Sequence, residues 1–135
     1  MSSPRTIAFV CLHGSAKSLI AAEYLNRRAR ERGLRWTGTT SGPEPDASVP
    51  ANVIEGLRRQ GIDATSRVPE RVTAAALRRA AHIVSFACDA PRALAPEAAV
   101  EAWDDCPAVS EDFEIAWRFI TGHVDRLLER LAAEG

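Results

Sequence analysis

Hydrophobic and polar positions alternate along the chain in blocks that predict four strands and four helices. Continuous apolar or β-branched runs bounded by polar residues are typical of buried strands, whereas apolar residues at helical spacing are typical of amphipathic helices. Thr73 and Ser110 are the expected caps of the last two helices, and Gly33 and Gly61 follow the first two. The strands are expected at 6–11, 34–40, 82–87 and 98–103, and the helices at 17–32, 50–60, 73–81 and 110–133.

The order of these elements indicates the fold class. Strands that alternate with helices predict one α/β domain over residues 1–135, built as a doubly wound, four-stranded parallel sheet flanked by helices. In such sheets, ligands bind where the strands reach their carboxyl ends. Side chains that directly follow the predicted strands are therefore the first candidates for function.

The composition narrows the classes of partner. The 135 residues include 17 basic and 18 acidic side chains, so the charge balance gives no case for nucleic acid or membrane binding. No apolar run approaches the ~20 residues that a membrane span needs. The odd, small number of cysteines predicts a reducing cytoplasm rather than a disulfide framework. Of the 17 basic residues, 16 are arginine, and Lys17 is the only lysine.

The segment between the first predicted strand and helix carries the most chemistry. A loop there directs backbone N–H groups and the positive end of the helix dipole at one point, which favours a tetrahedral anion. Cys11 at its mouth would be stabilised as a thiolate nucleophile, Lys17 adds a positive charge, and Ser18 can donate a hydrogen bond to the sulfur. The candidate anion-binding residues are Leu12, His13, Gly14, Ser15, Ala16 and Lys17.

Two other interpretations of this segment exist. Cys11 can be an inert buried residue that closes a strand. Lys17-Ser18 also matches the end of a nucleotide P-loop, but that motif needs glycine at positions 11 and 16, which are Cys11 and Ala16 here.

These residues resemble the low-molecular-weight protein tyrosine phosphatase superfamily, which includes thiol-dependent arsenate reductases. The family's loop is Cys-x5-Arg-Ser after the first strand, and the likeness extends over nearly the whole chain. Thr40-Ser-Gly-Pro-Glu-Pro45 resembles the family's Ser-Ala-Gly loop, and His82-Ile-Val-Ser-Phe-Ala-Cys88 resembles the strand before a redox cysteine of arsenate reductases. Trp103-Asp-Asp-Cys-Pro107 resembles the general-acid loop.

Several positions depart from the family pattern. Lys17 replaces an arginine whose planar fork grips two oxygens of the transition state, so anion binding should survive while the clamp weakens. Gly14 aligns with an asparagine held in a left-handed conformation, which glycine adopts without strain. His13 stands where the phosphatases have glycine, as an exposed loop residue or as a functional one. Cys106 precedes Pro107 where the family usually has aspartate.

The acid that protonates the leaving oxygen is therefore expected to be Asp105 or Asp104, the alternative being a solvated turn. Ala108 and Val109 follow this loop in place of the aromatic residues that stack on phosphotyrosine. Tyr24, the only tyrosine, is expected in the core.

The leading hypothesis is an arsenate-reductase-like enzyme in which Cys11 attacks a tetrahedral oxyanion held by loop amides and Lys17. Cys88 and Cys106 are the candidates for completing the reduction, with an external thiol or a thioredoxin- or glutaredoxin-type protein as reductant, and no metal or bound cofactor is implied. The first alternative is a phosphatase that acts on phosphomonoesters through a phosphocysteine. The second is a catalytically weak module that binds phosphate or arsenate.

Overall fold

The computed structural model describes residues 5–134, so the first four residues and Gly135 of the predicted domain lie outside it. Its four strands are all parallel and lie in the order β2-β1-β3-β4. This confirms the predicted fold class. The strands are β1 (Arg5–Val10), β2 (Trp36–Ser41), β3 (His82–Ser85) and β4 (Glu101–Ala102).

The strands β1 and β2 pair along their whole length, whereas the other edge of the sheet is short. In β4 only Glu101 and Ala102 pair with β3, opposite Val84 and Ser85. The strand predicted at 98–103 is therefore mostly not a strand. Its apolar residues Ala98 and Val100 are instead partly buried against the core on one side of the sheet, which explains the hydrophobic pattern without pairing.

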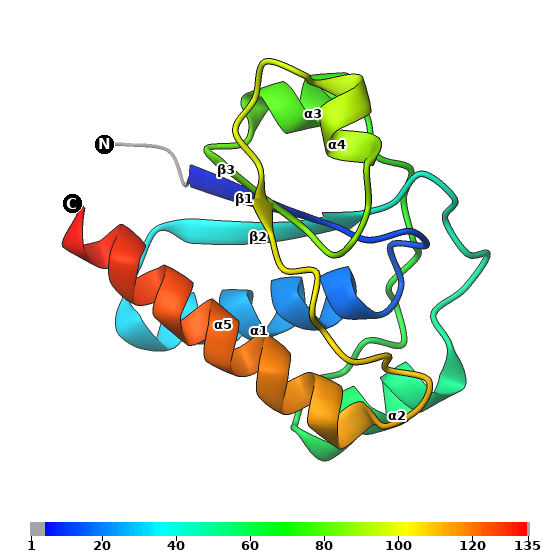
Figure 1. The fold of residues 1–135 in the computed structure, drawn as a ribbon. Coiled ribbons are helices and arrows are strands. Elements are labelled where there is room, and N and C mark those ends of the chain that lie inside the picture. The colour runs from blue at the N-terminus through cyan, green and yellow to red at the C-terminus, as the bar shows by residue number, and fades with distance from the viewer. Residues whose placement is uncertain (1–4, 135) are drawn as a thin grey trace.

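Helices cover both faces of the sheet (Figure 1). Those on one face are α1 (Lys17–Arg32), α2 (Ala51–Arg59) and α5 (Phe113–Ala133), and those on the other are α3 (Ala74–Arg79) and α4 (Ala90–Leu94). The short helix α4 was not predicted, because its single turn is too short to show a helical period. No helix within residues 5–134 has the length and apolar content to cross a membrane.

The start of α5 differs from the prediction. Asp112 caps it, since its carboxylate accepts a hydrogen bond from the Ile115 amide at 3.2 Å. Ser110 lies in the preceding turn, where the Glu111 amide donates to the Ala108 carbonyl. The prediction that Ser110 caps this helix is therefore wrong.

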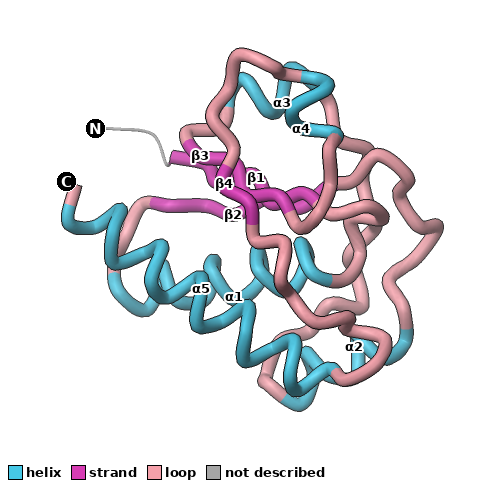
Figure 2. Tube along the Cα trace, in the orientation of Figure 1, coloured by secondary structure: helices cyan, strands magenta, loops and turns pink. Residues whose placement is uncertain are grey.

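The residues of β1 alternate between two hydrophobic cores. Ile7 and Phe9 face the larger core under α1 and α5, while Ala8 and Val10 face a smaller core under α3 and α4. The tube view shows that the loops following β1, β2 and β3 meet at one edge of the sheet (Figure 2). The segment 11–18, which the sequence analysis identifies as the candidate site, lies at that edge.

Candidate active site

Cys11 directly follows β1 at the carboxyl edge of the sheet, and its sulfur contacts a chain of hydroxyl groups. Its sulfur lies 3.0 Å from the Ser18 hydroxyl, which lies 2.7 Å from the Thr40 hydroxyl. Thr40 in turn donates to the Gly14 carbonyl at 3.2 Å. The Ser18 proton can point to Thr40 when Cys11 is a thiol, or turn to the sulfur when Cys11 is a thiolate. The Ser18 hydroxyl is therefore placed to donate a hydrogen bond to the Cys11 sulfur.

The first carbonyl groups of the loop from Leu12 to Ala16 bond to the segment after β2. The Leu12 and His13 carbonyls accept hydrogen bonds from the amides of Glu44 and Asp46 at 2.9 and 3.2 Å. Within the described part of the chain, by contrast, the backbone amides of 12–16 donate no hydrogen bond. Gly14 and Ser15 are nevertheless buried. A run of amides without partners beside a buried cysteine is a receptacle for an anion.

Two local features keep this receptacle open. Gly14 has a φ of +61°, which confirms the predicted left-handed conformation at this position. The cap residue of α1 is Ala16, which offers no side-chain hydrogen bond, and the first turn of the helix contains no acidic residue. The positive end of the helix dipole is therefore left for a bound anion.

Lys17 begins α1 and is partly exposed. Among residues 5–134, no carboxylate lies within ion-pair distance of its ammonium group. The charge is felt at Cys106, where burial raises the pKa of the thiol to about 11 and Lys17 acts in the opposite direction. The Lys17 charge thus remains available for an oxyanion.

A cavity of about 390 Å³ opens in front of Cys11. The anion-binding loop forms its floor, Asp46 and Pro50 form one wall, and the segment after β3 forms another. Ala108 and Val109 also line it. Leu12 adds an apolar surface at the mouth, since its side chain is 46% exposed.

Neither acid candidate lines this cavity. The Asp104 carboxylate accepts a hydrogen bond from the Ala87 amide at 3.0 Å. Ala87 has a φ of +50°, a strained value for a residue with a side chain, so Asp104 fixes a strained turn in the cavity wall. Asp105 is exposed. The role of either carboxylate as an acid stays a prediction.

The remaining cysteines are buried free thiols. Cys88 packs into the smaller core on the far face of the sheet, whereas Cys11 packs into the larger one. Burial raises the pKa of the Cys88 thiol, and Cys11 is near enough to add to the effect. Cys106 donates a hydrogen bond to the Pro107 carbonyl at 3.5 Å. Their roles as redox partners stay predictions.

Asp46 was missed by the sequence analysis. Its carboxylate accepts a hydrogen bond of 2.5 Å from the Ser15 hydroxyl and lies 3.7 Å from the His13 ring. The only signal in the sequence is its position in the loop that follows a strand.

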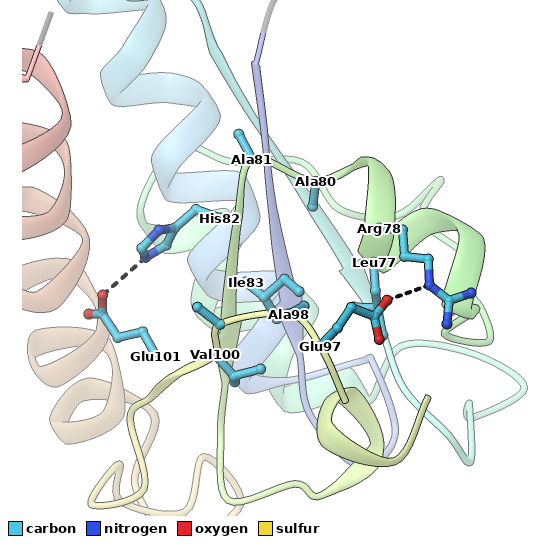
Figure 3. A pocket seen from close by; sticks show the side chains of 11 residues that line it. Leu77, Arg78, Ala80, Ala81, His82, Ile83, Glu97, Ala98, Val100 and Glu101 are labelled. Carbon is cyan, nitrogen blue, oxygen red and sulfur yellow. Dashed lines mark hydrogen bonds and ion pairs between the residues drawn. The ribbon is translucent and has the colours of Figure 1, made fainter. Parts of the chain in front are cut away.

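A second cleft, of about 510 Å³, lies at the amino end of β3 (Figure 3). Its residues form ion pairs with one another: His82 Nε2 lies 3.0 Å from Glu101, and Arg78 lies 2.6 Å from Glu97. It contains no nucleophile. Within residues 5–134 there is also no cluster of three or more side chains suited to a metal ion.

Comparison with known proteins identifies the family to which the chain belongs. The model of the low molecular weight phosphotyrosine protein phosphatase family matches residues 6–105, and the chain belongs to this family. No curated protein sequence matches the chain.

Solved structures share the fold at low sequence identity. YfkJ from Bacillus subtilis has a TM-score of 0.87 and 19% identity over 98% of both chains. The tyrosine phosphatase Wzb from Escherichia coli, in complex with sulphate, has a TM-score of 0.77 and 17% identity over 93% of this chain and 97% of its own. A thioredoxin-dependent arsenate reductase from Corynebacterium glutamicum has a TM-score of 0.80 and 18% identity over 99% of this chain and 65% of its own.

Proposed function

We propose that this protein hydrolyses phosphomonoesters through a phosphocysteine formed on Cys11. The observation that carries the proposal is the run of backbone amides of 12–16, directly after this thiol, that have no partner within the described residues. Family membership and a sulphate-bound neighbour support the same chemistry. The small side chains of Ala108 and Val109 in the cavity wall favour a substrate other than a large aromatic phosphate.

The reaction has two steps. The Cys11 sulfur attacks phosphorus, the bond to the leaving oxygen breaks, and that oxygen takes up a proton. Loop amides and Lys17 neutralise the charge on the remaining oxygens. Water then attacks the phosphocysteine, which releases phosphate and restores the thiolate that Ser18 stabilises.

The test is hydrolysis of p-nitrophenyl phosphate by the Cys11→Ser variant. We expect a loss of ~10³-fold or more in kcat/KM, since the nucleophile is removed. Cys88→Ala is the matched control, because it alters a buried thiol of the smaller core, and it should keep the wild-type rate. Unchanged hydrolysis by Cys11→Ser would refute the proposal.

Arsenate reduction is the second candidate, favoured by the Cys88 thiol near Cys11. Cys11 would attack arsenate and expel hydroxide, which leaves as water. Cys88 would then attack the Cys11 sulfur, forming a disulfide while As(V) is reduced to arsenite, and an external thiol or thioredoxin would reduce the disulfide. Because Cys88 packs on the far face of the sheet, this step requires the loop after β3 to move.

The two candidates separate in one assay of arsenate turnover with glutathione, thioredoxin or glutaredoxin. The relay predicts that Cys88→Ala abolishes turnover, whereas wild-type rates in this variant would exclude the relay. Phosphate binding without turnover of either substrate would instead indicate an oxyanion-binding module, in which Lys17 has lost the transition-state clamp.

A further inference from the structure

His13 is held in one orientation at the mouth of the cavity. Its Nδ1 atom lies 2.8 Å from the Glu44 carbonyl oxygen, and a carbonyl can only accept, so Nδ1 carries a hydrogen. The Asp46 carboxylate lies 3.7 Å from the same nitrogen and supplies a counter-charge when the ring is doubly protonated. Both contacts use Nδ1, which leaves Nε2 as the ring nitrogen that can exchange a proton with a substrate.

Asp46 is bound to the anion-binding loop at two further points. One carboxylate oxygen accepts from the Ser15 hydroxyl at 2.5 Å, and the backbone amide donates to the His13 carbonyl at 3.2 Å. The bond between Ser15 and Asp46 joins residues that are 31 positions apart in the sequence. They fix the His13 ring relative to the loop that would hold the phosphoryl group.

The other groups that line the cavity are poor proton donors. Asp46 already accepts a hydrogen bond as a carboxylate, and Lys17 must keep its charge to hold an oxyanion. Cys11 is the nucleophile. Imidazole is the side chain that exchanges protons most readily near neutral pH.

We propose that His13 protonates the leaving oxygen, in place of the acid-loop aspartate, and that Asp46 is the residue that positions it. This inference rests on the proposed phosphatase function. As the bond between phosphorus and the leaving oxygen breaks, the oxygen takes the proton from Nε2, and the ring becomes neutral while Nδ1–H stays on the Glu44 carbonyl. In the second step, Nε2 takes a proton from the attacking water, so the original form returns.

The dependence on the leaving group tests this role. A general acid matters most when the leaving oxygen is strongly basic, and it contributes ~10²–10⁴-fold. His13→Gln should lower kcat/KM for phenyl phosphate by ~10²-fold or more, and should lower it far less for p-nitrophenyl phosphate, whose leaving group is more acidic. Asp46→Asn should change the ratio of the two rates in the same direction.

Three further variants make the outcome decisive. His82→Gln is the matched control, because His82 forms the same kind of histidine–carboxylate pair at the opposite end of β3, away from Cys11, and it should keep both rates (Figure 3). Equal losses on both substrates in His13→Gln, or a leaving-group effect in Asp105→Asn alone, would overturn the assignment. Cys11→Ser separates the proposed phosphatase function from the role of His13. If Cys11→Ser abolishes turnover while His13→Gln leaves the ratio of the rates on the two substrates unchanged, only the role of His13 is refuted.

Discussion

Gly42 lies where the segment after β2 meets the anion-binding loop, and its replacement by alanine should displace that loop. A Cβ atom at this position would overlap the Cys11 carbonyl oxygen and lie 2.6 Å from both the Gly14 nitrogen and the Leu12 carbonyl oxygen. All of these are backbone atoms, which cannot swing aside as a side chain can. The Gly42 backbone is also held in place on its other side. Its amide donates to the Glu70 carbonyl and its carbonyl accepts from the Val72 amide, each at 3.0 Å.

The size of the effect follows from this confinement. Overpacking typically costs about 1–3 kcal/mol, and the fixed atoms on both sides of Gly42 place Gly42→Ala at the upper end of that range. For a chain of this length, a loss of about 3 kcal/mol lowers the melting temperature by about 10 °C. A ligand present at a hundredfold excess over its Kd stabilises a protein by about 2.7 kcal/mol. Displacement of the loop should remove most of that protection by phosphate.

The assay is thermal unfolding with and without phosphate, for wild type, Gly42→Ala and a matched glycine variant. Gly122→Ala is the control, because its Cβ would meet only the flexible Arg126 guanidinium, at 3.5 Å, within helix α5. Removing a helical glycine should stabilise the protein by about 0.5–1 kcal/mol without changing the phosphate shift. A Gly42→Ala variant that melts at the wild-type temperature with the full phosphate shift would refute the reasoning.

Three further variants test the charge at Lys17, the hydrogen bonds of Tyr24 and the ion pairs of Glu101. Lys17→Arg should raise kcat/KM for p-nitrophenyl phosphate by ~10–100-fold, because the guanidinium adds charge-assisted hydrogen bonds in the transition state; no gain would argue against an intact receptacle. Tyr24→Phe should cost about 1 kcal/mol in chemical denaturation by removing the hydroxyl bonds to Asp125 at 2.9 and 3.0 Å. Burial, reinforced by Asp125, raises the pKa of Tyr24 to about 12, so stability should fall as the pH rises from the ordinary value of 10.0 towards 12. Burial opposes ionisation of Glu101, but hydrogen bonds from its neighbours, among them Arg130, hold its pKa below 4.5. The contribution of Glu101 to folding stability is therefore present above pH 4.5 and is lost as the pH falls through the pKa of the folded state. Glu101→Gln should cost about 1–2 kcal/mol near neutral pH and flatten stability in acid, as urea unfolding at several pH values would show.

The sequence predicted the elements whose patterns are long and clearly bounded. The boundaries of α1 agree with the prediction, because a full amphipathic period ends at Gly33, which has a φ of +66°. The place of the loop after Cys11 also follows from local sequence, whereas the left-handed Gly14, with a φ of +61°, was predicted from the family resemblance. The short elements could not be predicted in this way, because the five residues of α4 and the two of β4 are too few to show a period.

Long-range contacts within the site were beyond the sequence. Asp46 meets Ser15 only because two loops converge at one edge of the sheet, and no local pattern records that convergence. The face of the sheet on which Cys88 packs was equally hidden. The sequence indicates that this residue follows a strand, but β3 ends at Ser85, and the intervening turn directs Cys88 into the smaller core.

The two departures from the family pattern at Lys17 and Cys106 are linked by electrostatics. The family places an aspartate before the proline of its acid loop, and this chain has Cys106, whose pKa of about 11 keeps it uncharged near neutral pH. Lys17 lies close enough to act on that pKa, so a carboxylate at position 106 would compete with a bound oxyanion for the only lysine of the loop. An arginine could serve two carboxylate or phosphate groups through separate N–H donors, whereas the compact ammonium concentrates its charge at one point. The neutral thiol therefore leaves the lysine free for an anion, and it removes the family's aspartate, whose task we propose for His13.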